Sequence, residues 1–374
     1  GFDYYFGIAA SLDMVPYTFI ENDRVTAPPT TDKAFPMMLG REGGATRRGP
    51  AAADFEAAAV LPALTRKAVE TIRQRAAAGK DGPNAGAQAQ PFFLYLPLAS
   101  PHTPIVPTDE WQGKSGLNPY ADFVMQTDAS VGAVLDALDS AGIAGNTLVF
   151  LTSDNGCSPQ AKFAELEEKG HFPSERFRGT KADIFEGGHR VPFIARWPAR
   201  IKAGTSSDQL VCLNDLMATC AEIVGAKLPD DAGEDSVSLL PALLGRAEKP
   251  LREALVHHSI NGSFAIRQGQ WKLALCADSG GWSAPRPATP AAAKLAPVQL
   301  YDLASDIGET RNVEARETEV VARLTKLLER YVGEGRSTPG APQTNNGEVR
   351  LRPAAKASVP REKPGATSAQ PPGS

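Results

Sequence analysis

The chain has 374 residues, of which 42% are hydrophobic and 22% charged, and its net charge is -4 at pH 7. This composition is typical of a folded globular protein, and the lack of a basic excess argues against nucleic acid as a partner. No apolar run approaches the roughly 20 residues that a membrane helix needs, so no membrane span is predicted.

Helix and strand patterns alternate through the first two thirds of the chain. Apolar residues recur every three to four positions over residues 57–72 and 120–138, which predicts two amphipathic helices, the second ending at Gly142. Short apolar runs predict buried strands at residues 92–96, 146–152 and 191–197. This alternation predicts an α/β fold, with a mostly parallel sheet and helices on both faces.

The pattern changes near residue 245. Residues 264–275 predict an antiparallel hairpin around Gly269, and residues 319–332 predict an amphipathic helix, which together indicate a small α+β subdomain. The last 40 residues are rich in Pro, Gly, Ser and charge without periodicity, which predicts disorder. We therefore expect an α/β domain over residues 1–245, an α+β subdomain over 246–333 and a disordered tail over 334–374.

Three polar loops lie next to the predicted strands. The first, Ser-Pro-His-Thr-Pro at residues 100–104, holds His102 between two prolines, which are expected to keep the backbone extended. A lone histidine is more often structural than functional. The second loop contains Asp154-Asn155-Gly156, which is either a tight turn or part of a site for a hard cation that prefers oxygen ligands.

The third loop, residues 178–189, carries Lys181, and His171 lies a few residues upstream. Taken alone, it is most simply a surface loop with a solvated lysine. Since ligands bind at the carboxyl ends of strands in α/β sheets, we expect the three loops to converge. We call the loop of Asp154 and Asn155, with the divalent cation it would hold, the metal corner. A histidine, a lysine and this metal corner together would suit an oxyanion such as phosphate, sulfate or one of their esters.

The motifs also carry a family resemblance. Ser-Pro-His-Thr-Pro (100–104), Thr-Ser-Asp-Asn-Gly (152–156), Arg-Gly-Thr-Lys (178–181) and Glu-Gly-Gly-His-Arg-Val-Pro (186–192) occur in the order seen in sulfatases. The chain resembles a formylglycine-type, arylsulfatase-like member of the alkaline-phosphatase-like superfamily. Residues 1–7 and 299–312 are similar to further segments of that family.

The resemblance implies hydrolysis of a small-molecule or carbohydrate sulfate ester to an alcohol and inorganic sulfate. It implies that Asp154 and Asn155 are ligands of Ca2+, with Mg2+ as an alternative, and that His102 and Lys181 are catalytic residues that contact the sulfate. It also implies a substrate-binding role for His171. By family inference the protein is periplasmic or extracellular, and the intact protein needs formylglycine-generating machinery as a partner.

One family feature is missing. The Cys/Ser-x-Pro-x-Arg motif that supplies the formylglycine nucleophile does not occur: Cys157-Ser158-Pro159-Gln160-Ala161 imitates it but has Ala161 in place of arginine. The paired aspartates and the Lys-x-His motif are also absent, and all three lie before the Gly1 segment in sulfatases. We therefore expect an N-terminally truncated, inactive fragment. The alternatives are a phosphodiester or phosphonate hydrolase of the same superfamily and a non-catalytic homologue that binds sulfated glycans.

Overall fold

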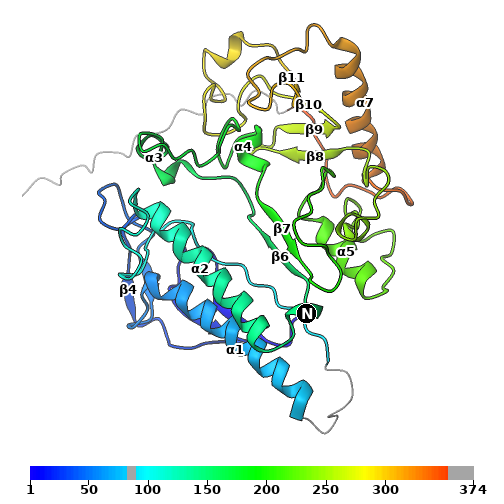
Figure 1. Cartoon of the computed structure of the whole chain (residues 1–374). Coiled ribbons are helices and arrows are strands. Elements are labelled where there is room, and N and C mark those ends of the chain that lie inside the picture. The colour runs from blue at the N-terminus through cyan, green and yellow to red at the C-terminus, as the bar shows by residue number, and fades with distance from the viewer. Residues whose placement is uncertain (82–89, 353–374) are drawn as a thin grey trace, which may run out of the picture.

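The computed structural model describes residues 1–81 and 90–352 (Figure 1). Most of the Gly- and Ala-rich stretch after the first predicted helix, and residues 353–374 of the predicted disordered tail, lie outside this range. Residues 335–352 are more ordered than the sequence predicts. Buried Arg336 donates hydrogen bonds to the carbonyls of Thr338, Pro339 and Ala341, which fold the chain back beyond the last helix.

The two predicted N-terminal helices are confirmed as α1 (Val60–Asp81) and α2 (Pro119–Ser140), which pack side by side (Figure 1). A short 3-10 turn, η1 (Ala57–Ala59), leads into α1. The side chain of Asn118 caps α2 by accepting a hydrogen bond from the Ala121 N–H. Gly142 follows α2 with a φ of +73°, which agrees with the predicted glycine stop.

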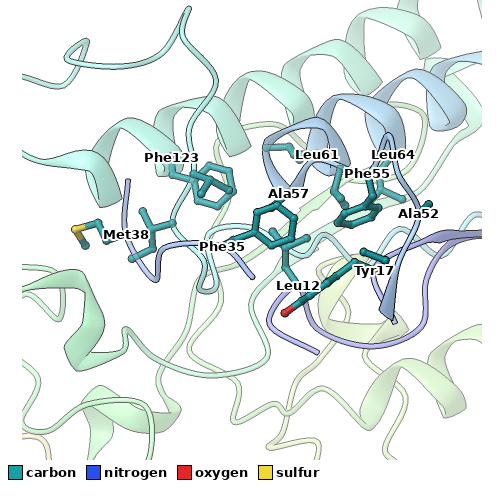
Figure 2. Close-up of a cluster of buried hydrophobic side chains, with 14 residues drawn as sticks. Leu12, Tyr17, Phe35, Met38, Ala52, Phe55, Ala57, Leu61, Leu64 and Phe123 are labelled. Atoms are coloured by element: carbon teal, nitrogen blue, oxygen red, sulfur yellow. The ribbon is translucent and has the colours of Figure 1, made fainter. Parts of the chain in front are cut away.

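An aromatic core lies beneath α1. Tyr17, Phe35 and Phe55 pack ring against ring, with centroids 5.1–6.0 Å apart, among aliphatic residues of α1 and beside Phe123 of α2 (Figure 2). These three residues lie in the connections before, between and after short antiparallel strands: β1 (Phe6–Ile8), β2 (Phe19–Glu21), β3 (Arg24–Val25), β4 (Thr31–Lys33) and β5 (Gly49–Ala51).

Two of the predicted strands form, but they do not pair as predicted. β6 (Val149–Thr152) and β7 (Phe193–Arg196) pair antiparallel, with Val149 opposite Arg196 and Thr152 opposite Phe193. All four sheets among the described residues are small and antiparallel, so the structure does not show the predicted parallel sheet.

The third predicted strand, residues 92–96, belongs to no sheet of the described residues. Its side chains nevertheless alternate as in a strand. Phe92 and Leu94 pack against the cluster that α1 and α2 share, while Phe93 and Tyr95 remain 69% and 65% exposed. The apolar run therefore predicts the extended backbone correctly, but the strand partner that it implies is not found in the described part of the chain.

The C-terminal prediction is confirmed in its elements. β8 (Leu255–His258), β9 (Phe264–Gln268), β10 (Trp271–Ala274) and β11 (Gln299–Asp302) form an antiparallel sheet in the order β11-β10-β9-β8. Helix α7 (Thr318–Glu334) covers it with an apolar stripe (Figure 1). Along the chain, α5 (Asp215–Ile223) and the short α6 (Leu240–Leu243) come between β7 and this sheet. No described helix combines the length and the apolar character needed to cross a membrane.

Candidate active site

Two of the three predicted loops are joined by backbone hydrogen bonds. The Gly156 N–H donates to the Gly188 carbonyl (3.0 Å), and the Lys181 N–H donates to the Cys157 carbonyl (2.9 Å). Asp154 and Asn155 directly precede Gly156. The structure therefore joins the loop of Asp154 and Asn155 to the loop of Lys181, although it does not show the parallel sheet from which this convergence was predicted.

Lys181 lies in this contact as a half-buried cation. Its side chain forms no hydrogen bond or ion pair with any residue that the structure describes. Partly buried charges are costly unless a counter-charge compensates them. The arrangement therefore suits an anionic ligand.

Asp154 and Asn155 supply oxygen ligands, but too few for a complete metal shell. Asp154 is exposed and Asn155 is half-buried. Ser153 Oγ orders their turn by donating to the Asn155 carbonyl (2.9 Å). Hard cations such as Ca2+ take six to eight oxygens, and the described residues contain no cluster of three or more His, Cys, Asp or Glu that could hold a metal. The two side chains therefore have the right ligand atoms for Ca2+, but they are too few to form its coordination shell.

A buried aspartate fixes the loop on the other side of Lys181. Asp183 is fully buried, and its carboxylate accepts from the Thr180 N–H (2.7 Å), the Trp282 N–H (2.7 Å) and the Ser283 N–H (3.0 Å). The hydroxyls of Thr180 and Ser283 add two further bonds. A loop of the C-terminal subdomain, residues 279–283, is thereby held against the Lys181 loop.

A second buried network lies after Lys181, in the short helix α4 (Glu186–His189). Glu186 accepts from Lys272 of β10, and Arg190 and Arg267 lie 3.3 Å from its other oxygen. Burial by itself would raise the pKa of Glu186, but Lys272 and Arg267 outweigh burial and hold that pKa below its usual value. Sequence reasoning missed this network, because nothing in the local pattern marks Glu186 or Lys272 as buried.

His102 lies in a bend and not in extended backbone, which corrects the prediction for this loop. Residues 100–104 turn, and the peptide bonds before Pro101 and Pro104 are both cis. His102 is exposed, and its Nδ1 lies 2.7 Å from the Thr103 carbonyl, to which it donates, leaving Nε2 free. Among the described residues, no hydrogen bond joins His102 to the Lys181 loop.

His171 follows α3 (Phe163–Glu167), where its N–H donates to the Leu166 carbonyl (3.0 Å) and its side chain is exposed. The next residue, Phe172, lines a cavity of about 220 Å3 that also touches Gly179 and Thr180. A larger cavity of about 420 Å3 lies at the start of α2. No predicted site residue lines either cavity, but Gly179 and Thr180 in the wall of the smaller one directly precede Lys181, so the smaller cavity is the one of interest.

The nucleophile look-alike is structural. Cys157 donates through its thiol to the Tyr120 hydroxyl (3.2 Å), and burial raises the thiol pKa, which disfavours the reactive thiolate. Ala161, which stands where the motif requires arginine, is 1% exposed inside an apolar cluster. This site has no room for an arginine, so the interpretation of Cys157 as a decoy agrees with the packing.

Comparison with known proteins places these loops in a family. The model of the family described as "Sulfatase" matches residues 65–226. An N-acetylgalactosamine-6-O-sulfatase of Bacteroides thetaiotaomicron is 32% identical over 88% of this chain and 68% of its own length. Bovine arylsulfatase A is 35% identical over 62% of this chain. The chain belongs to the sulfatase family.

Solved structures agree with this assignment. A B. thetaiotaomicron 6S-sulfatase, described under the metabolism of multiple glycosaminoglycans, superposes with a TM-score of 0.71 at 30% identity, covering 88% of this chain and 72% of that one. A protein solved in complex with a neocarrahexaose has a TM-score of 0.56 at 26% identity, over 73% of this chain and 54% of its own. The chain spans about two thirds of the length of the bacterial sulfatase and 46% of bovine arylsulfatase A.

Proposed function

We propose that this chain forms part of a metal-dependent enzyme that hydrolyses a carbohydrate sulfate ester to an alcohol and inorganic sulfate. The observation that carries the proposal is the position of Lys181. Its half-buried side chain forms no ion pair with any described residue, and its loop is hydrogen-bonded to the loop of Asp154 and Asn155. The sulfatase motifs and the relatives support the same reaction.

Each side chain has a role in the proposal. Lys181 binds a sulfate oxygen and neutralises the charge that grows on the leaving oxygen. His102 Nε2, in the protonated ring, donates a proton to that oxygen. Asp154 and Asn155 contribute two ligands of Ca2+, which would polarise the sulfate when bound. His171 adds a substrate contact, as the family resemblance implies.

The nucleophile lies outside this chain in the proposal. A formylglycine, made by the family's generating machinery, supplies the attacking hydroxyl in sulfatases, and these 374 residues contain no Cys/Ser-x-Pro-x-Arg motif. The periplasmic or extracellular location proposed for the protein likewise follows from the resemblance. Isolated, this chain should bind sulfated ligands without turning them over.

A carbohydrate is favoured as the substrate. Relatives named N-acetylgalactosamine-6-sulfatases and a structural neighbour solved in complex with a neocarrahexaose support it. A non-catalytic glycan-binding protein is the second candidate, because the chain lacks the nucleophile motif. The sequence upstream of Gly1 separates the two: a Cys/Ser-x-Pro-x-Arg motif there supports catalysis, and its absence supports binding alone.

The binding part of the proposal can be tested on the chain itself by calorimetric titration in the presence of Ca2+. We expect N-acetylgalactosamine 6-sulfate to bind and the unsulfated sugar not to bind. Lys181→Ala should weaken the sulfated ligand by about 10-fold or more, as expected for loss of a charge-assisted hydrogen bond. Lys202→Ala, at an exposed position, is the matched control.

Three results would contradict the proposal or a part of it. Equal affinity for the sulfated and unsulfated sugars would show that the chain has no sulfate-binding site. Tighter binding of the corresponding phosphate ester would favour a phosphohydrolase of the same superfamily. Turnover of a chromogenic sulfate ester by the isolated chain would show that its nucleophile lies within these residues.

A further inference from the structure

The cavity beside the Lys181 loop has a distinct composition. It measures about 220 Å3, and its walls combine aromatic rings with hydroxyl and carboxylate groups. Its lining includes Phe163, Glu167, Phe172, Phe177, Thr180 and Ser283. Pockets that enclose drug-sized ligands measure roughly 300–1,000 Å3, so this cavity suits a single ring better than an extended chain.

The cavity shares backbone with the proposed sulfate site. Gly179 and Thr180 form part of its wall and immediately precede Lys181, whose N–H is bonded to the metal-corner loop. Asp183 fixes Thr180 and Ser283, and the two hydroxyls lie 3.4 Å apart. One wall of the cavity is thus rigid and directly adjoins the residue that would hold the sulfate.

Two other residues of the lining, Phe172 and Glu167, have side chains without partners among the described residues. Phe172 is 58% exposed, an unusual exposure for a phenylalanine beside a cavity. Glu167, at the end of α3, is exposed and forms no ion pair with the residues described here. An open ring face next to a free hydrogen-bond acceptor is the combination that recognises a ring with an apolar face and hydroxyl edges.

We propose that this cavity is the subsite for the sugar ring of the sulfate ester, with the ring stacked on Phe172 and one of its hydroxyls donating to Glu167. The assignment rests on the proposed function, since it requires the sulfate to lie at Lys181. Glu167 also gives the subsite a preference for the charge of the sugar. A free carboxylate repels a second sulfate or a uronic acid carboxylate, so the subsite takes a neutral sugar ring.

The test separates ring recognition from sulfate recognition. N-acetylgalactosamine 6-sulfate and inorganic sulfate are titrated into the chain in the presence of Ca2+. Phe172→Ala should lower the affinity for the sugar sulfate by about 2- to 13-fold, the range expected for loss of an aromatic contact. It should leave the affinity for inorganic sulfate unchanged. Phe172→Tyr should restore sugar binding. Phe93→Ala, another exposed phenylalanine outside the cavity, should change neither ligand.

A second variant tests this charge preference. Glu167→Gln should narrow the preference for the monosulfated sugar over the 4,6-disulfated one, because it removes the repelling charge. If Phe172→Ala and Glu167→Gln both leave the sugar affinities unchanged while inorganic sulfate still binds, the subsite is overturned and the sulfate site stands. If the unaltered chain binds neither ligand, the proposed function itself fails.

Discussion

Lys272 Nζ lies 3.0 Å from Glu186 Oε1, and both side chains are almost completely buried. Glu186 begins α4, five residues after Lys181, and Lys272 lies in β10, so the pair joins the Lys181 loop to the C-terminal sheet. Lys272 also lies 2.9 Å from the buried carboxylate of Glu309. The small subdomain therefore helps to hold the candidate active site in place.

We expect Lys272→Met to be strongly destabilising. The variant leaves two buried carboxylates without their shared cation, and breaking a buried pair in this way costs about 3–5 kcal/mol of unfolding free energy. Urea denaturation measures the change. Arg330→Met is the control, because it breaks an exposed pair with Glu253 and should cost no more than about 1 kcal/mol. Equal costs in the two variants would contradict a structural role for the buried pair.

The burial of His189 and of its neighbour His257 makes stability depend on pH. Their ring centroids are 4.3 Å apart, and His189 Nε2 is buried without a hydrogen-bond partner among the described residues. Burial, reinforced by Lys272, lowers the pKa of His189 from 6.5 to about 4. The unfolded chain therefore takes up a proton between pH 6.5 and 4 that the folded chain does not, and stability falls as pH falls through this window.

The expected loss from His189 is up to about 3 kcal/mol of unfolding free energy between pH 6.5 and 4. Burial also lowers the pKa of His257 well below its ordinary value, which adds to the loss in the same direction. Denaturation curves at a series of pH values measure it. The slope of unfolding free energy against pH should be shallower in His189→Gln, and an unchanged slope would show that other groups control it.

Sequence reasoning predicts elements here better than it predicts their partners. Helix periodicity located α1, α2 and α7, because each buries one stripe that recurs in the sequence. The structure does not show the predicted parallel sheet, because an apolar run specifies a buried strand and not its neighbour. β6 pairs antiparallel with β7, and residues 92–96 pair with nothing in the described range.

The candidate site divides in the same way. Lys181, Asp154 and Asn155 stand in loop motifs that are visible in the sequence, and the structure joins their loops. Asp183 and Lys272 were missed, since their importance comes from partners about 100 residues away in the chain. Only the folded chain reveals that these buried charges support the loop.

Asp183→Asn should loosen the Lys181 loop without touching the ligand. An amide nitrogen would face N–H donors of Thr180, Trp282 or Ser283, and at least one buried hydrogen bond to a charged group would be lost. We expect a loss of about 1.5–3 kcal/mol in unfolding free energy, together with weaker binding of inorganic sulfate. Calorimetric titration and urea denaturation measure the two effects. Asp23→Asn, at an exposed position, is the control.

Gly156 is required because the metal-corner loop and α4 approach each other too closely for a side chain. A Cβ built at Gly156 would lie 1.8 Å from the carbonyl oxygen of Gly187, a backbone atom that cannot move without displacing α4. Gly156→Ala should therefore cost at least about 1–3 kcal/mol of unfolding free energy and separate Lys181 from Asp154 and Asn155, which weakens sulfate binding.

Gly132→Ala provides the matched control for this substitution. Gly132 lies inside α2, and a Cβ there meets nothing within 4 Å. Alanine should stabilise the helix by about 0.5–1 kcal/mol, because glycine loses more backbone entropy in a helix than alanine does. Thermal unfolding and sulfate titration compare the stability and the sulfate affinity of the two variants. If Gly156→Ala is as stable and binds sulfate as well as Gly132→Ala, the close contact between the two loops does not hold the site together.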